Sequence, residues 1–231
     1  MSWVLGIDTS SVDMGIGLFK NDYAVASYTR YIKNSHAEHI SQAVAHILSV
    51  NSVSPSEIKH IAITCGPGSF TGLRIGIAFA KGFSFSTGAL VHPVSSLQVL
   101  AHAARTHTGI ITAAIDARNG DVFQASFESL GGIISRHSED CVCSKDEFLA
   151  SVVPGAVIVT DTMGYDKSTV FTSISSSNIH LPIEKFPINR GYFCALKGAS
   201  VLGDSSAWIN EIDLHPNYLR SSAARIPSPK G

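Results

Sequence analysis

The sequence predicts an α/β protein made of two tandem domains, each built on a mixed sheet. Apolar runs of strand length alternate with segments of helical periodicity along the 231-residue chain. Two of these runs, Leu5-Gly-Ile-Asp8 and Ala114-Ile-Asp116, end in an aspartate and lead into a hairpin. Each is followed by two more strand-like runs and a helical pattern. The two halves of the chain therefore open in the same way.

The first half predicts a three-strand meander followed by helix–strand units. The expected elements are strands at 4–7, 15–19 and 23–31, a helix from Ser35, a short helix after Ser54, a strand at 61–65, a helix at about 73–86, a strand at 90–91 and a helical pattern over 95–104. The first long helix is predicted from apolar residues at helical spacing, namely Ala37, Ile40, Val44, Ile47 and Leu48. Pro55 suits the first turn of the short helix.

The second half repeats this pattern. The expected elements are strands at 110–115, 122–127 and 133–137, a helix near 145–152, a strand at 156–160 and a helix at about 191–202. Asn119-Gly120 and Gly131-Gly132 are hairpin turn signals. A duplicated meander with helix–strand units is the plan of the actin/hexokinase/Hsp70-like (RNase H-like) fold. The alternative is two unrelated α/β domains.

We expect a first domain over residues 1–105 and a second over 106–231. The sequence leaves open whether the segment after Trp208 packs on the second domain or returns to the first.

Composition narrows the class of protein. Apolar residues make up 45% and charged residues 15% of the chain, so extended disorder is not expected. The formal net charge is −1, which does not suggest a protein that binds nucleic acid alone. The four cysteines include no CxxC pair, so neither a disulfide framework nor a zinc site is expected. Without a signal-peptide pattern or an apolar run of roughly 20 residues, we expect a cytoplasmic protein that does not contact membranes.

A glycine-rich segment, Gly66-Pro-Gly-Ser-Phe-Thr-Gly72, joins a predicted strand to a predicted helix. Free N–H groups at a helix start can bind an anion, and the candidate nucleotide-facing residues are Gly66, Gly68, Ser69, Thr71 and Gly72. The segment nevertheless does not match the specific nucleotide-binding motifs, because a P-loop needs Gly-Lys where Gly72-Leu73 stands. A dinucleotide fingerprint would also need a glycine in place of Thr71. The alternative is a tight turn that lets a slim helix pack on the sheet.

Two aspartates at strand ends are candidates for nucleotide contact. In this fold class Asp8 can hold a metal–nucleotide complex while Thr9 and Ser10 touch phosphate. Asp116 and Arg118 stand at the equivalent strand end of the second half. The alternatives are an Asx turn at Asp8 and a salt-bridged hairpin corner at Asp116.

His36 and His39 lie three residues apart on the first predicted helix. They make at most half a metal site, because zinc takes three or four ligands and the H-E-x-x-H signature is absent. A polar helix edge or a protein–protein contact is the favoured interpretation, and no metal site is expected. The sequence shows no motif typical of a carboxylate pair, a Ser/His/Asp set or a Cys/His set, so no catalytic residue is predicted.

Taken together, these stretches resemble the TsaB (YeaZ) family. The similar segments are residues 5–10, 35–39, 66–76 with 80–82, 95–97, 116–118 and 216–220, of which 66–76 is the most specific. The resemblance implies a two-domain actin-like fold and a non-catalytic, dimerising role in transferring threonylcarbamoyl to the adenosine next to the anticodon of tRNA. The implied partners are a TsaD-type catalytic subunit and a TsaE-type ATPase, with tRNA contacted only through the complex. The chain alone is expected to be a homodimer.

The resemblance also assigns roles to residues. TsaD-type subunits carry a His-x-x-x-His metal pair where this chain has His92 and Ser96, and a serine hydroxyl is a poor transition-metal ligand. This implies a pseudoenzyme without a cofactor of its own, and leaves open whether ADP or ATP lies at the interface with the catalytic subunit. The candidate nucleotide-facing residues at the strand ends and in the glycine-rich segment would then be vestiges of a nucleotide site. The implied partner contacts are His36, His39, Ile40, Ala43, Ile75 and Phe79.

The rival hypothesis is an enzyme in its own right. It would be an ATP-using enzyme of the actin/hexokinase class or a glycoprotease-like peptidase.

Overall fold

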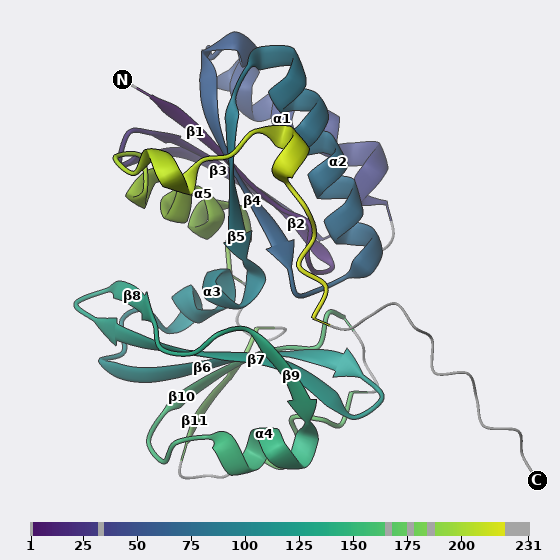
Figure 1. Ribbon diagram of the computed structural model, residues 1–231, viewed down its shortest axis with the longest axis vertical. Coiled ribbons are helices and arrows are strands. Elements are labelled where there is room, and N and C mark those ends of the chain that lie inside the picture. The colour runs from purple at the N-terminus through teal and green to yellow at the C-terminus, as the bar shows by residue number, and fades with distance from the viewer. Residues whose placement is uncertain (1, 32–34, 165–167, 175–177, 184–187, 220–231) are drawn as a thin grey trace, which may run out of the picture.

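The computed structural model describes residues 2–31, 35–164, 168–174, 178–183 and 188–219, which form two sheet-centred domains stacked one above the other (Figure 1). The strands of the first sheet are β1 (Trp3–Asp8), β2 (Asp13–Lys20), β3 (Tyr23–Tyr31), β4 (Ile58–Gly66) and β5 (Leu90–Ser95). They lie in the order β3-β2-β1-β4-β5. β1, β2 and β3 form an antiparallel meander, whereas β4 and β5 run parallel to β1.

The second sheet repeats this arrangement. Its strands are β6 (Gly109–Arg118), β7 (Asp121–Leu130), β8 (Ile133–Arg136), β9 (Cys141–Ser144), β10 (Val157–Asp161) and β11 (Ile179–Pro182). They lie in the order β11-β10-β6-β7-β8, with β9 also paired to β7. Read from β8, this is the order of the first sheet. The duplication confirms the predicted α/β fold with two mixed sheets.

The longer helices sandwich the first sheet. They are α1 (His36–Val50) and α2 (Phe70–Thr87) on one face and α5 (Arg190–Ser200) on the other (Figure 1). α3 (Ser96–Ala101) lies between the two sheets, and α4 (Lys145–Ser151) lies beyond the second sheet. Short 3-10 helices complete the description: η1 (Pro55–Glu57), η2 (His102–Ala104), η3 (Ser205–Ala207) and η4 (Glu211–Asp213).

Helix α5 follows the second sheet in sequence but packs on the first. Its backbone lies directly on the strands, because a Cβ added to Gly191 would overlap the backbone of Ile16, and one added to Gly15 would overlap Gly191. The helix closes an apolar cluster that includes Val4, Phe19 and its own Phe193.

The chain then stays with the first domain. Ile209 pairs with Val91 of β5, and Leu214 lies in the core beneath α1 and α2. The segment after Trp208 therefore contacts the first domain, while the domain boundary near residue 105 stays a prediction.

Three local expectations were wrong. His36, rather than Ala37, begins the inward face of α1. Helix α2 starts at Phe70 instead of 73, because the Ser69 side chain accepts a hydrogen bond from the Gly72 N–H and so caps the helix earlier. Strands β9 and β11 were not predicted as elements.

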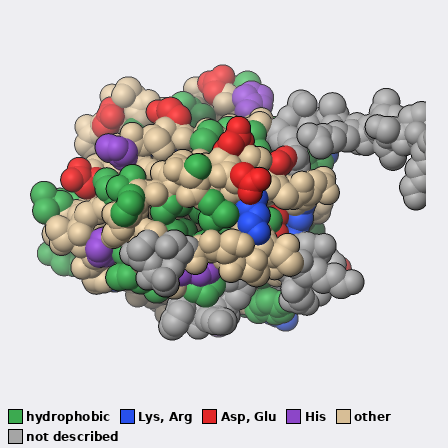
Figure 2. All heavy atoms as spheres, turned by 90° about the horizontal axis from the view of Figure 1, so that it is seen from below, with side chains coloured by type: hydrophobic (Ala, Val, Ile, Leu, Met, Phe, Trp, Pro, Cys, Tyr) green, Lys and Arg blue, Asp and Glu red, His purple; other side chains and the backbone are tan. Residues whose placement is uncertain are grey.

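Within the described part of the chain, none of the helices has the length and apolarity needed to span a membrane. The face turned downward in Figure 1 is shown in Figure 2, with Asp and Glu side chains scattered among neutral ones. The Lys and Arg side chains of described residues in that view form no broad patch. This face therefore lacks the concentrated positive charge on which nucleic acids bind.

Candidate functional site

A pocket of about 670 Å³ opens between the two domains. The first domain contributes the turn after β1, the start of α1 and the start of α2, and the second contributes the β6–β7 hairpin and the segment after β10. The lining residues are Ser11, Val12, His36, Gly68, Ser69, Phe70, Thr71, Gly72, Ile75, Ala117, Arg118, Phe123 and Met163.

The glycine-rich loop is closed against the Asp8-Thr9-Ser10 turn. Thr9 Oγ1 donates a hydrogen bond to the Gly72 carbonyl at 2.8 Å, and the Ser69 N–H donates to the Ser10 carbonyl at 2.8 Å. A Cβ on Gly72 would overlap the Thr9 carbonyl oxygen. The glycines of the loop allow two backbone segments to touch, while Gly68, Ser69, Thr71 and Gly72 also line the pocket.

Asp8 is fully buried in an Asx turn. Its Oδ1 accepts hydrogen bonds from the Ser10 N–H at 2.9 Å and the Ser10 hydroxyl at 2.8 Å. Its Oδ2 is also buried and has no hydrogen-bond partner among the described residues. The carboxylate is thus turned toward its own loop, and Asp8, Thr9 and Ser10 do not line the pocket.

Asp116 makes the equivalent turn in the second domain. Its Oδ1 accepts a hydrogen bond from the Arg118 N–H at 2.7 Å, and its Oδ2 lies 3.9 Å from Arg118 Nη1. This is the salt-bridged hairpin corner, which leaves Arg118 on the wall of the pocket. Gly66 and Asp116 line smaller neighbouring pockets instead. Whether any of these residues meets a nucleotide stays a prediction.

His36 and His39 have different environments. His36 is buried at the pocket wall, and burial lowers the pKa of its imidazole despite hydrogen bonds with the backbone of Asp13 and Ser11. His39 is half-buried, with its Nδ1 3.4 Å from Arg30 Nη1. Among the described residues no group of three His, Cys, Asp or Glu side chains is placed to hold a metal ion.

The predicted partner contacts divide into two groups. Ile40 and Ala43 are buried against the first sheet in the inward stripe that starts at His36, so most of their surface is covered by the chain itself. His39, Ile75 and Phe79 are only partly buried. Contact with a partner stays a prediction. His39, Ile75 and Phe79 have more surface available for such a contact than Ile40 and Ala43.

The side chains of His92 and Ser96 lie in different environments. The His92 Nδ1 lies 2.7 Å from the Ala207 carbonyl oxygen, and its ring packs near Trp208 at 5.5 Å between centroids. Ser96 is fully buried, and its hydroxyl has no hydrogen-bond partner in the described part of the chain. Neither residue lines the interdomain pocket.

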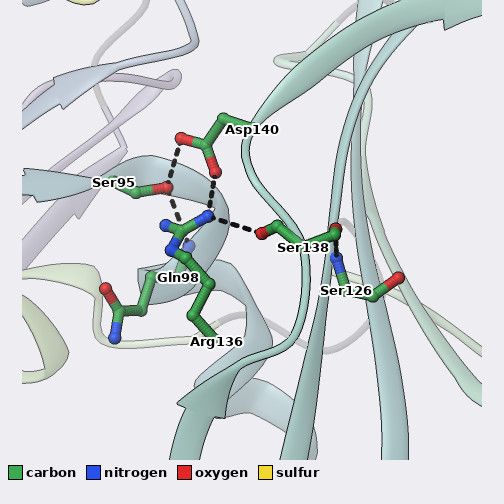
Figure 3. A network of polar contacts seen from close by, with 6 residues as sticks. All are labelled: Ser95, Gln98, Ser126, Arg136, Ser138 and Asp140. Atoms are coloured by element: carbon green, nitrogen blue, oxygen red, sulfur yellow. Dashed lines mark hydrogen bonds and ion pairs between the residues drawn. The ribbon is translucent and has the colours of Figure 1, made fainter.

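Sequence reasoning missed a polar network on another side of the domain junction (Figure 3). The Ser95 hydroxyl caps α3 by accepting from the Gln98 N–H at 3.2 Å and donates to Asp140 Oδ2 at 2.7 Å. Arg136 Nη1 donates to Asp140 Oδ1 at 2.7 Å and to the Ser138 carbonyl at 3.0 Å. Because Ser95 and Asp140 come from different domains, the network ties the first sheet to the second.

An aromatic stack at the pocket was missed as well. The Phe70 and Tyr218 rings lie 5.1 Å apart with an interplanar angle of 29°. The Arg74 guanidinium carbon lies 4.5 Å from the centre of the Phe70 ring. No local pattern could pair Phe70 with a residue so far along the chain.

Comparison with known proteins agrees with this architecture. A family model described as TsaD: tRNA N6-adenosine threonylcarbamoyltransferase matches residues 30–224. Among solved structures, YeaZ from Pseudomonas aeruginosa superposes with a TM-score of 0.79 at 25% identity, covering 95% of this chain and 100% of that one.

Curated relatives carry the name tRNA threonylcarbamoyladenosine biosynthesis protein TsaB. The Bacillus subtilis protein is 35% identical over 133 residues and the Escherichia coli protein 35% over 127 residues. These matches span about half the length of each relative, 58% and 54% respectively. The Haemophilus influenzae protein is 30% identical over 234 residues, which cover 94% of this chain and 93% of the relative.

The match to the Haemophilus influenzae protein extends over nearly the whole chain, and the fold agrees with YeaZ along its length. The chain therefore belongs to the TsaB (YeaZ) family.

Proposed function

We propose that this chain is the non-catalytic dimerisation and scaffold subunit of a system that forms N6-threonylcarbamoyladenosine in tRNA. Family membership supports a place in that system. The proposed partners are a TsaD-type catalytic subunit and a TsaE-type ATPase, and tRNA is contacted within the complex. An ADP or ATP molecule, where one is needed, is assigned to the interface with the catalytic subunit.

The observation that supports a non-catalytic role most directly is the closed glycine-rich loop. A phosphate-binding loop must turn free N–H groups toward its ligand. Here the Ser69 N–H is taken up by the Ser10 carbonyl, and Asp8 is fully buried in its own turn. The Ser69 N–H and the Asp8 carboxylate are thus occupied within the chain, which supports a non-catalytic role.

The partner surface is proposed to be the outer face of α1 and α2. On this face His39, Ile75 and Phe79 remain partly exposed. The same face would join two copies when the catalytic subunit is absent. Two helices presented side by side can pack against two helices of a partner by interlocking their side-chain ridges.

The test is a reconstituted modification reaction. It contains tRNA, threonine, bicarbonate, ATP, the synthase that makes threonylcarbamoyl adenylate, the catalytic subunit and the ATPase, with and without this chain. Product is expected only when the chain is present. An equal yield without the chain would refute the proposal and make ATP hydrolysis by the lone chain the next measurement.

A further inference from the structure

The opening of the interdomain pocket carries an exposed aromatic platform, formed by Phe70 and Tyr218. Phe70 lines the pocket and is 44% exposed, and Tyr218 is 42% exposed while stacked upon it. The Arg74 guanidinium lies over the Phe70 ring. Exposed aromatic rings beside a guanidinium are the surface on which unpaired nucleobases stack, at about 1–3 kcal/mol per base.

The pocket wall beside this platform holds two polar atoms that lack a partner. Ser11 Oγ and His36 Nε2 are buried, and neither forms a hydrogen bond within the described part of the chain. Ser11 is 3% exposed and His36 is 6% exposed, and both line the pocket. A buried polar group left unsatisfied costs about 1–3 kcal/mol, so these atoms mark positions where a ligand can supply the missing partner.

The two groups match the edge of a base. A hydroxyl both donates and accepts a hydrogen bond, while the His36 ring, which already bonds to the backbone of Asp13 and Ser11, offers its Nε2 alone. Burial lowers the pKa of His36, which keeps the ring neutral at pH 7. Nucleobase edges present donors and acceptors side by side, and single-stranded RNA is recognised through them.

The charge around the opening favours a phosphate-bearing ligand. Among the described residues that line the pocket, Arg118 is the one charged side chain, and none is Asp or Glu. Arg118 is held 3.9 Å from Asp116, and Arg74 adds a second cation at the platform. Because Arg118 is paired with Asp116 and the carboxylates of Asp8 and Asp13 act on His36, the cation left to meet a phosphate at the platform is Arg74.

We propose that this pocket receives one unpaired base of an RNA strand, which stacks on the Phe70–Tyr218 platform and hydrogen-bonds to Ser11 and His36. The proposal rests on the proposed function, since it names the surface by which the chain touches the tRNA inside the complex. A volume of about 670 Å³ accommodates a base with its ribose.

The test is a titration of the full chain, assembled with its catalytic subunit, with a labelled RNA hairpin, followed by fluorescence anisotropy at low salt. A blunt RNA duplex of equal length has no unpaired bases and serves as the reference ligand. The hairpin is expected to bind more tightly than the duplex. Phe70→Ala and Tyr218→Ala are each expected to weaken hairpin binding by about 5- to 150-fold, the equivalent of one lost stacking contact.

The variants have matched controls. Phe85→Ala removes an aromatic ring that is 82% exposed on the same helix, and it should leave hairpin binding unchanged. Phe70→Leu keeps the apolar bulk but removes the aromatic face, so it should weaken binding as Phe70→Ala does. Thermal unfolding of each variant shows whether the fold is kept.

Equal binding of hairpin and duplex overturns the proposal, as does unchanged affinity in both Phe70 variants. Displacement of the hairpin by AMP at similar concentration would show a mononucleotide site instead of an RNA site. The reconstituted reaction separates the two claims. If product still requires the chain while loop-dependent binding is absent, the base-binding site is wrong and the scaffold function stands.

Discussion

Arg190 in α5 and Asp161 at the end of β10 form a buried ion pair, with the two residues 1% and 2% exposed. Arg190 Nη2 donates to Asp161 Oδ2, while Asp161 Oδ1 accepts from the Met163 N–H at 2.6 Å. Since α5 packs on the first sheet and β10 belongs to the second, this pair joins the two domains. The remaining nitrogens of Arg190, Nε and Nη1, have no hydrogen-bond partner among the described residues.

Removing one member of this pair should destabilise the protein strongly. Asp161→Asn removes the carboxylate that is bonded to the buried Arg190 and leaves Asp13 as a nearby carboxylate, and we expect a loss of about 3–5 kcal/mol in the free energy of unfolding. The double variant Arg190→Met/Asp161→Leu removes both charges and should recover much of that loss. Urea unfolding measures all three proteins. A double variant no more stable than the single one would show that the pair itself supplies the stability.

The contact between α5 and the strands predicts opposite effects for two glycine substitutions. Alanine normally stabilises a helix relative to glycine by about 0.5–1 kcal/mol. At Gly191 the added methyl group overlaps the backbone of Ile16, so Gly191→Ala should cost about 1–3 kcal/mol or more. Gly82 in α2 has open space around it, so Gly82→Ala should be neutral or stabilising. Equal effects at the two sites would contradict the close packing.

His102 should make stability depend on pH. Its ring stacks on Phe193 at 5.0 Å, and burial, followed by the charges of Arg105 and Lys197, lowers its pKa from 6.5 to about 4. Between these two values the unfolded chain binds the proton more tightly. The stabilising contribution is therefore complete above pH 6.5 and falls as the pH drops toward 4.

His102→Phe keeps the stacked ring but cannot titrate. When the pH is lowered from about 7.5 to about 5, the free energy of unfolding of the unsubstituted protein should fall by about 2 kcal/mol more than that of this variant. Burial also lowers the pKa of His36, His60 and His92, so the difference between the two proteins, and not the slope of either, isolates His102. Parallel pH profiles from urea unfolding would refute the assignment.

Ser95 and Asp140 should show coupled effects on stability. Ser95→Ala removes both the cap of α3 and the hydrogen bond to Asp140, while Asp140→Ala leaves Arg136 without its carboxylate. We expect a coupling energy of about 0.5–3 kcal/mol in a double-mutant cycle, because the two side chains touch. Hydrogen exchange of the Gln98 amide gives an independent measure of the lost cap. Additive effects of the two substitutions would show that no such interdomain tie operates in solution.

The proposed partner surface predicts a change of mass in solution. Phe79→Asp places a carboxylate on the outer face of α1 and α2, where desolvating it would oppose association. Light scattering should report a dimer for the unsubstituted chain and a monomer for the variant. Tyr23→Asp changes a side chain that is 73% exposed on β3, away from this face, and should leave the dimer intact. A monomeric mass for the unsubstituted chain would remove the proposed self-association.

The strand and helix pattern was predictable because each long element carries its own period of apolar residues. The meander of β1, β2 and β3 and the glycine-marked hairpin turns were found this way. β9 and β11 were missed because each has four residues, too few for an alternation to stand out, and neither follows a turn signal like the Gly131-Gly132 pair that marks the equally short β8. The inward position of His36 was missed because the residue is polar, although it shares a helix face with Ile40.

The site was less predictable than the fold. The glycine-rich loop and the two strand-end aspartates were identified as segments, but their orientation depends on contacts such as Thr9 to Gly72. The features that join the domains come from residues far apart in sequence. Arg190 and Asp161 come into contact only once both sheets have formed. The local sequence around either residue does not predict this ion pair. Sequence patterns report local geometry, whereas these contacts are a property of the complete topology.

The late position of α5 also affects how the protein is made. During synthesis on a ribosome the strands of the first sheet emerge early, but the helix that covers one of their faces comes from residues 190–200. Until then the nascent chain exposes Val4, Phe19 and Val94, which end up beneath that helix. Exposed apolar surface on an unfinished chain favours aggregation and chaperone binding. The first domain should therefore become resistant to protease only after residues 190–200 have left the exit tunnel.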